Sequence, residues 1–489
     1  MKKLSKPKLN IFTTLANQLV ATACGIVVPR ILIGGFGSEA YGITVSITQF
    51  LSYITLLEGG IGGVARAKLY EPLALGDQQK ISAVYRAEQT FFRHVALVFL
   101  LYSVALGFAF HDLAKVTLYS RSYVFLLVLV ISAATLAKYL FGLPNLTLIV
   151  ADQKQYINNY IMMGTTVLNT LLVVFLVNRS CDLLWVKLGS SVVFLLRPIV
   201  YAAYVHKNFH IQKTQEAKLE QKWTGIGQHI AYFLHTNTDV VLLTLFADVK
   251  FVAVYAVYNL VISSVRAITQ SVSGSMEARF GELIAKGKRP ALLSAYCKYK
   301  SLLTAVTLTL FGCTGVLILP FVRLYTKGIT DADYLQPAFA VVLMLAEAMN
   351  CLVLPCASLP VAANRFRQTR WGAYGEAMIN LVLSLVLIHW NPLLGVVIGT
   401  LIATLFRALY YMIYSAKEIL RVSPYRVLVW FFGAMLLLLG VTAAGNLLLR
   451  AITIDNYLQW FLCGMIVFAA LAVPSALALK FGMKRETFF

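Results

Sequence analysis

The stretch GSSVVFLLRPIVYAAYVHK at residues 189–207 is matched by GTLIATLFRALYYMIYSAK at residues 399–417. The identical positions are Gly189, Leu195, Arg197, Tyr201, Tyr204 and Lys207 in the first stretch, and Gly399, Leu405, Arg407, Tyr411, Tyr414 and Lys417 in the second. In a register shifted by one residue, an earlier set also recurs: Pro144, Val150, Ala151, Gly164 and Asn169 match Pro355, Val361, Ala362, Gly375 and Asn380. Proline, asparagine, arginine and lysine in register within apolar segments indicate a duplicated unit of six helices, and duplicated membrane bundles are typical of transporters.

The composition indicates a membrane protein. The chain has 489 residues, of which 59% are hydrophobic and 13% charged, and its mean hydropathy is +0.75. Apolar runs of about 20 residues predict an all-α polytopic membrane protein with about 14 transmembrane helices. We expect these helices near residues 11–33, 42–62, 91–111, 122–143, 157–178, 184–204, 226–247, 252–273, 301–322, 336–357, 371–389, 393–414, 427–449 and 457–480.

The formal charge of +21 is unevenly distributed among the loops. Roughly 29 of the 42 lysines and arginines fall on one side of the predicted spans, and by the positive-inside rule this side is cytoplasmic. Both termini are on that side. Insertion bias and attraction to anionic membrane lipids explain the charge, so we expect no nucleic-acid partner.

The repeat predicts the division of the chain. We expect a six-helix lobe at 1–205, a cytoplasmic linker at 206–225, a second six-helix lobe at 226–417, and two additional helices with a cytoplasmic tail at 418–489. An even number of crossings in each repeat predicts two bundles related by a pseudo-twofold axis along the membrane normal. The longest cytoplasmic loops, after spans two and eight, are each expected to form a short helix with a local ion pair or to gate the cytoplasmic mouth.

Polar side chains inside spans mark the candidate site, because they are costly in hydrocarbon. The sequence places Asn17, Gln18, Arg30, Gln49, Glu58, Lys138, His229, His235, Asn237, Asp239, Arg266, Glu347 and Glu376 within the predicted spans. His235 and Asp239 share a helix face near the middle of span seven. This pair either couples transport to an ion or ties two helices together through hydrogen bonds.

Two groups of span cations have alternative roles. Arg30 and Lys138 either face a water-filled cavity and attract a diphosphate or acidic sugar, or extend to the nearer headgroups. Arg197 and Arg407 occupy equivalent positions, where a repeated structural bond is favoured over substrate contact. Since the sequence contains no catalytic triad, Cys-x-x-Cys pair or Walker motif, we expect no enzyme activity, no metal site and no cofactor.

Short motifs resemble the polysaccharide-exporter branch of the multidrug/oligosaccharidyl-lipid/polysaccharide (MOP) flippase superfamily, the O-antigen flippase (Wzx-type) family. They are Asn17-Gln18, Pro29-Arg30, Phe36-Gly37-Ser38-Glu39, Tyr41-Gly42, Leu57-Glu58, Gly59-Gly60-Ile61-Gly62, Gly227-Gln228-His229-Ile230-Ala231-Tyr232, Thr238-Asp239 and Leu324-Tyr325-Thr326-Lys327-Gly328-Ile329-Thr330-Asp331. Their order and spacing carry the resemblance, which covers about the first 420 residues.

The resemblance implies a MATE-like fold with a cavity lined mainly by spans one, two, seven and eight. It also implies a flippase of the bacterial inner membrane that moves undecaprenyl-diphosphate-linked oligosaccharides to the periplasmic leaflet for surface polysaccharide (O-antigen, capsule or exopolysaccharide) biosynthesis. A glycan polymerase and a chain-length regulator are the expected protein partners.

These inferences assign roles to the span residues. Arg30, Lys138 and Arg266 are expected to attract phosphate or acidic sugar, Asn17, Gln18 and Asn237 to bind sugar hydroxyls, Glu58 and Glu347 to line the same substrate site, and His235 and Asp239 to couple transport to protons or sodium. The nearest alternative is a cation-coupled drug or metabolite exporter of the same fold. A membrane glycan polymerase or transferase is disfavoured because no outer loop exceeds roughly 13 residues.

Overall fold

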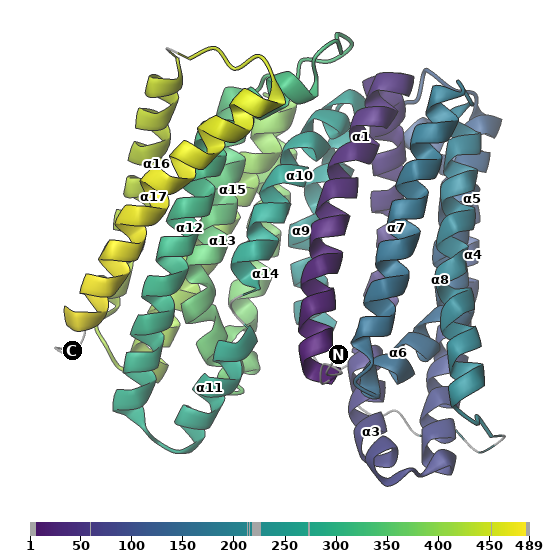
Figure 1. Cartoon of the computed structure of the whole chain (residues 1–489), viewed down its shortest axis with the longest axis horizontal. Helices are drawn as coiled ribbons and strands as arrows, with labels where there is room; N and C mark the ends of the chain where they lie inside the picture. The colour runs from purple at the N-terminus through teal and green to yellow at the C-terminus, as the bar shows by residue number, and fades with distance from the viewer. Residues whose placement is uncertain are drawn as a thin grey trace, which may run out of the picture. The chain divides into compact units, whose positions relative to one another are not determined.

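The structure, a computed structural model, describes residues 6–58, 60–212, 214, 216–217, 226–271, 274–450 and 452–485. For a few of the helical residues in these ranges, His229 and His235 among them, only the backbone is described. All the regular secondary structure in the described chain is helical (Figure 1). The all-α fold predicted from the sequence is therefore confirmed.

The chain divides into two compact units. The N-terminal unit comprises Met1–Ile230 and Asp248–Ala253, and the C-terminal unit comprises Ala231–Ala247 and Val254–Phe489. The helices up to the linker are α1 (Lys6–Ser52), α2 (Thr55–Glu58), α3 (Ile61–Leu75), α4 (Gln78–Leu113), α5 (Arg121–Ala137), the π-helix η1 (Lys138–Gly142), α6 (Leu143–Ala151), α7 (Gln155–Asn178) and α8 (Leu183–Asn208). After the linker follow α9 (Ile226–Phe246), α10 (Val249–Gln270), α11 (Gly274–Ala285), α12 (Arg289–Tyr325), α13 (Pro337–Ala362), α14 (Phe366–Leu387), α15 (Pro392–Tyr414), the π-helix η2 (Ser415–Leu420), α16 (Pro424–Leu449) and α17 (Tyr457–Arg485).

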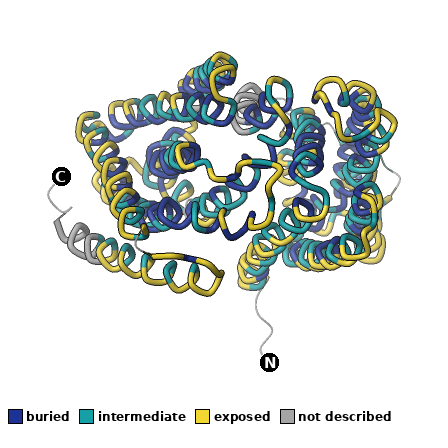
Figure 2. Tube along the Cα trace, turned by 90° about the horizontal axis from the view of Figure 1, so that it is seen from above, coloured by how far each residue is buried: buried dark blue, intermediate teal, exposed yellow. Residues whose placement is uncertain are grey.

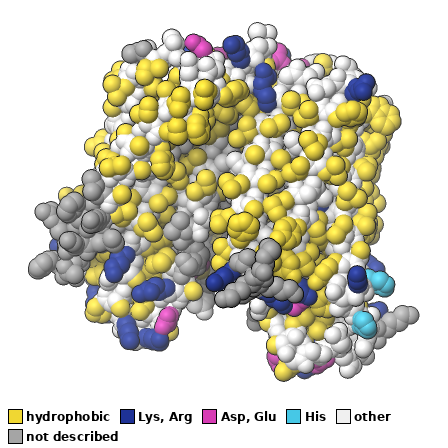
Figure 3. Space-filling view, viewed as in Figure 1, with side chains coloured by type: hydrophobic (Ala, Val, Ile, Leu, Met, Phe, Trp, Pro, Cys, Tyr) yellow, Lys and Arg dark blue, Asp and Glu magenta, His cyan; other side chains and the backbone are white. Residues whose placement is uncertain are grey.

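Each of the predicted spans falls on one or more of these helices. Within the described residues, 11 helical stretches are long and apolar enough to cross a membrane. The first stretch, Lys6–Glu58, contains the predicted span 11–33 and most of the predicted span 42–62. They are joined at a kink at Gly37, whose φ of 84° and ψ of 172° suit glycine because it has no Cβ. Hydrophobic side chains cover much of the face in Figure 3, as expected for a multi-pass membrane protein.

Two short helices occupy matching places in the repeat. The helices α3 and α11 confirm the helices predicted after spans two and eight. In α11 the sequence pattern predicts a local ion pair between Arg279 and Glu282, but the structure pairs Glu282 with Lys286. This hydrogen-bonded ammonium lowers the pKa of the Glu282 carboxyl. Gly76 follows α3 and Gly287 follows α11, and both have positive φ values, of 70° and 63°. The two repeats therefore share their turns as well as their helices.

The segment after α8 lies along α4. The helix α8 extends to Asn208, so the first residues of the predicted linker are helical. The backbone N–H of Gln212 donates to Ser82 Oγ at 2.9 Å, and that of Ala217 donates to the Ala83 carbonyl at 3.1 Å. The described linker residues after α8 are non-helical, and hydrogen bonds from Gln212 and Ala217 attach them to α4.

The C-terminal unit has a buried centre and an exposed pair of helices. In α13, 83% of the most apolar stretch is buried, whereas in α17 none of it is. Figure 2 shows this contrast, because the helix next to the C label is exposed or intermediate along its described length. Both α16 and α17 pack against α12. Trp460 Nε1 on α17 donates to the Leu317 carbonyl on α12 at 3.1 Å. These two helices lie outside the repeat and add to one side of α12.

Candidate functional site

Asp239 is buried inside the C-terminal unit and is hydrogen-bonded on two sides. Its side chain is on α9 and the residue is 4% exposed. Thr400 Oγ1 on α15 lies 3.1 Å from each carboxylate oxygen, and the Tyr255 hydroxyl on α10 donates to Oδ2 at 3.1 Å. Such donors offset the cost of burying a carboxylate. Asp239 therefore ties three helices together, as in the structural alternative considered for it from the sequence.

A second chain of polar groups runs through four helices of the same unit. Arg266 on α10 pairs with Glu347 on α13 at 2.8 Å. Asn350 Nδ2 donates to Glu347 at 3.2 Å, and its Oδ1 accepts from Arg407 on α15 at 2.7 Å. Arg407 also pairs with Glu376 on α14 at 3.0 Å. The two arginines and two carboxylates thus compensate each other, which makes their burial tolerable.

The equivalent arginine of the N-terminal unit makes the same kind of bond. Arg197 on α8 donates to the hydroxyls of Thr165 at 2.7 Å and Thr166 at 3.0 Å, both on α7. Arg407 likewise reaches from α15 to the preceding helix, α14. A repeated helix–helix bond is thus present in both units, with hydroxyl acceptors in one and a carboxylate in the other.

Glu58 and Lys138 are brought together in the N-terminal unit. They come from different predicted spans, and Lys138 Nζ lies 3.3 Å from Glu58. The Tyr139 hydroxyl donates to the same carboxylate. Lys138 and Tyr139 lie in η1, and π-helical turns within longer helices frequently occur at functional sites.

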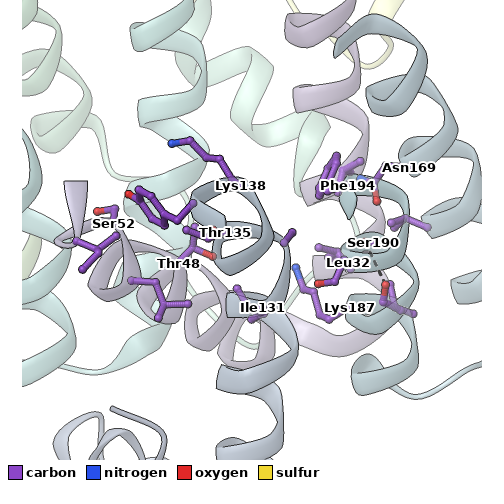
Figure 4. Close-up of a pocket in the computed structure, with 18 of the residues that line it drawn as sticks. Leu32, Thr48, Ser52, Ile131, Thr135, Lys138, Asn169, Lys187, Ser190 and Phe194 are labelled. Carbon is purple, nitrogen blue, oxygen red and sulfur yellow. Dashed lines mark hydrogen bonds between the residues drawn. The ribbon is translucent and has the colours of Figure 1, made fainter. Parts of the chain in front are cut away.

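A cavity of about 460 Å³ lies within this unit, between α1, α5 and α8 (Figure 4). Its lining includes Lys138, Asn169 and Lys187 together with several serine and threonine hydroxyls. A second cavity, of about 420 Å³, shares Lys187 and Asn169. The sequence reasoning missed Lys187, although this residue lies inside predicted span six, among apolar residues. The repeat could have revealed it. Lys187 and Val397 each lie two residues before the matched glycines, so the first unit has a lysine where the second has a valine.

The remaining candidate residues lie on α1 and α9. Asn17, Gln18 and Arg30 are on α1, where Asn17 and Arg30 are half-buried and Gln18 is exposed. Asn237 on α9 donates to the Phe233 carbonyl at 2.7 Å, so part of its hydrogen-bonding capacity serves its own helix. The side chains of His229 and His235 lie outside the described residues. Within the described residues, no group of three or more His, Cys, Asp or Glu side chains is placed to hold a metal ion.

Comparisons with known proteins identify the fold. No protein-family model matches the chain, and no curated protein matches it in sequence. A solved structure of the lipid II flippase MurJ in an inward closed conformation matches with a TM-score of 0.67 at 13% identity, covering 97% of this chain and 99% of that one.

Two transporter structures also share the fold. An inward-facing multidrug resistance MATE family transporter of the MOP superfamily has a TM-score of 0.59 at 12% identity, covering 88% of this chain and 99% of that one. The MATE multidrug transporter DinF-BH has a TM-score of 0.53 at 17% identity, covering 85% of this chain and 97% of that one. The MATE-like fold expected from the sequence is therefore confirmed.

Proposed function

We propose that the protein is a flippase for an undecaprenyl-diphosphate-linked oligosaccharide, working by alternating access in a bacterial inner membrane with both termini in the cytoplasm. The sugar diphosphate would occupy a polar cavity while the polyprenyl chain stays in lipid. The transported oligosaccharide serves the synthesis of a surface polymer, which is O-antigen, capsule or exopolysaccharide. A glycan polymerase and a chain-length regulator act together with the flippase.

The observation that carries this proposal is the extent of the fold match. The match to the lipid II flippase covers 97% of the chain, which leaves too few residues to omit both α16 and α17. The two MATE transporter matches cover 88% and 85%. The more complete match to the lipid II flippase therefore favours a lipid-linked cargo over a soluble drug.

The charges within the spans support the same choice. Arg30, Lys138 and Arg266 are proposed to attract the diphosphate or an acidic sugar, with Glu58 and Glu347 holding two of these cations in place. Asn17, Gln18 and Asn237 are proposed to bind sugar hydroxyls. His235 and Asp239 are proposed to couple transport to protons or sodium, with Asp239 released from Thr400 and Tyr255 in another conformation of the unit.

Deleting the gene and complementing it with variants tests the proposal. Deletion should leave lipid-linked oligosaccharide accumulated in the cytoplasmic leaflet, and D239A should fail to restore glycan display while remaining in the membrane. The double variant R266Q/E347Q removes both charges of the pair, so it tests Arg266 without leaving a buried carboxylate unpaired. K207A, at an exposed position near the end of α8, is the matched control and should restore display fully.

The rival function is export of a cationic drug. The same deletion strain should then retain normal glycan display and lose efflux of a cationic dye such as ethidium. Full display with D239A and R266Q/E347Q would remove the proposed cavity residues from the mechanism.

A further inference from the structure

Lys187 is a lysine of the N-terminal unit that has no partner among the described residues. It lies on α8, is half-buried, and lines the two cavities of about 460 and 420 Å³. Within the described part of the chain, its ammonium group makes no hydrogen bond or ion pair, in contrast to Lys138 beside Glu58. In Figure 4 the ammonium of Lys187 points towards the middle of the cavity. An unpaired cation in such surroundings costs free energy unless an anion joins it.

The cavity around Lys187 offers donors and lacks acids. Among the described residues that line it, there is no aspartate or glutamate. Thr48 and Ser190 already donate to backbone carbonyls of their own helices, at 2.7 and 3.1 Å. Within the described chain, the Asn169 amide and the Thr135 hydroxyl make no such bond, and the Asn169 side-chain oxygen is buried without a partner. Lys187, Asn169 and Thr135 are therefore available to bind a ligand from outside the chain.

At the matched positions of the C-terminal unit, the polar side chains are hydrogen-bonded to one another. Asn380, the equivalent of Asn169, donates to Thr400 at 3.2 Å, and Thr400 bonds Asp239. The position of Lys187 is taken by Val397, which is fully buried. At these matched positions the C-terminal unit thus has the carboxylate of Asp239, whereas the N-terminal unit has the ammonium of Lys187 beside a cavity.

We propose that the cavity at Lys187 is a binding site for a small oxyanion of the phosphate type. The Lys187 ammonium supplies the charge, and the Asn169 amide and Thr135 hydroxyl supply further donors; the side-chain amide of Asn169 presents its NH₂ to the anion. Weak screening inside the unit strengthens the attraction between ammonium and anion. The oxyanion is either a free ion or the diphosphate of a lipid. With a lipid diphosphate as the ligand, this site rests on the proposed function, whereas with a free anion it does not.

Ligand binding to the purified full-length protein in detergent tests this site. The probes are inorganic phosphate and geranyl diphosphate, measured by calorimetry and by the shift in melting temperature. K187M should weaken binding by about tenfold or more, because it removes the charge-assisted bonds. K187R keeps the charge and should retain most of the affinity. K207M, outside the cavity, should bind as the wild type does.

The melting temperature without ligand separates lost binding from lost folding. Removing an unpaired, half-buried cation should leave the K187M melting temperature unchanged or raise it. Binding of phosphate alone identifies a free anion, and binding of geranyl diphosphate alone identifies a lipid diphosphate; both outcomes support the site when they depend on Lys187. Equal affinities of K187M and wild type, or no binding of either probe to the wild type, would overturn it.

Discussion

The matched helices α8 and α15 share glycine, arginine, tyrosine and lysine at the same spacing, yet they enclose different interiors. Around α15, Thr400 and Arg407 bond to carboxylates on α9 and α14. Around α8, Arg197 bonds to two threonine hydroxyls, and Lys187 faces open volume. The duplicated backbone is therefore compatible with paired charges around α15 and with an unpaired lysine beside a cavity around α8. The two units therefore differ at these positions in charge and in bonding partners.

The largest expected effect of this difference concerns the two arginines. R407A leaves Glu376, whose side chain is 2% exposed, without its cation, and should lower the free energy of unfolding by about 3–5 kcal/mol. R197A removes the cation from two threonine hydroxyls and leaves no charged group unpaired. The Thr165 hydroxyl also keeps its hydrogen bond to the Ile161 carbonyl, at 2.7 Å. Its cost should be about 0.5–1.5 kcal/mol. Denaturant unfolding of both purified variants measures the difference.

The double variant R407M/E376M is the control for this pair. Replacing both charges by apolar side chains removes the unpaired carboxylate and should restore most of the stability. Equal losses in R407A and R197A would show that the carboxylate of Glu376 does not distinguish the two units.

The matched glycines should give a smaller difference. A Cβ at Gly399 would lie 2.2 Å from Ser384 Oγ and 2.9 Å from the Ser384 backbone nitrogen, so α14 and α15 would have to move apart. G399A should therefore cost about 1–3 kcal/mol. At Gly189 the nearest atoms are the flexible ends of Leu172 and Leu176, at 3.0 and 3.2 Å. Because alanine also favours the helix by about 1 kcal/mol, G189A should be neutral or stabilising.

Thermal unfolding of both glycine variants checks this order. S384A removes the hydroxyl contact but leaves the backbone contact, so it should rescue G399A only in part. Complete rescue would mean that the hydroxyl, rather than the approach of the two helices, sets the cost.

Apolar periodicity and length were sufficient to predict the long helices, but not the short helices α2 and α6. The predicted spans fell on helices because hydrocarbon requires every backbone group to be bonded within its segment. The joining of the first two spans at Gly37 was not predicted, because a kink depends on one residue's φ and ψ. The π-helical turns η1 and η2 were also missed, since hydrophobicity does not distinguish hydrogen-bond registers.

The candidate site was predictable only as a set of residues. Asp239, Arg266, Glu347 and Glu376 were recognised because charge within a span is rare. Their partners were not, since the bond between Asp239 and Thr400 joins residues far apart in the sequence. Lys187 was overlooked because its significance comes from what is missing around it, and a sequence does not show which side chains lack a partner.

The smallest expected difference concerns the starts of the long helices α4 and α12. Asp77 caps α4 by accepting from the Lys80 backbone N–H at 3.0 Å, and this bond lowers the pKa of the Asp77 carboxyl. Lys288, the matched residue before α12, makes no side-chain cap. Because the folded pKa is the lower one, the stabilisation is present above the unfolded pKa of about 3.9 and is lost as the pH falls through the folded pKa.

Hydrogen exchange, corrected for its intrinsic pH dependence, measures this effect at the first turn of each helix. Acidification below about pH 4 should reduce the protection of the Lys80 amide and leave that of Leu292 in α12 unchanged, because protonation weakens the Asp77 cap alone. D77A, which lacks the acceptor, should show the reduced protection of Lys80 already at neutral pH. If acid exposes both helix starts equally, the difference between the units does not extend to their caps and is confined to the interior around α8 and α15.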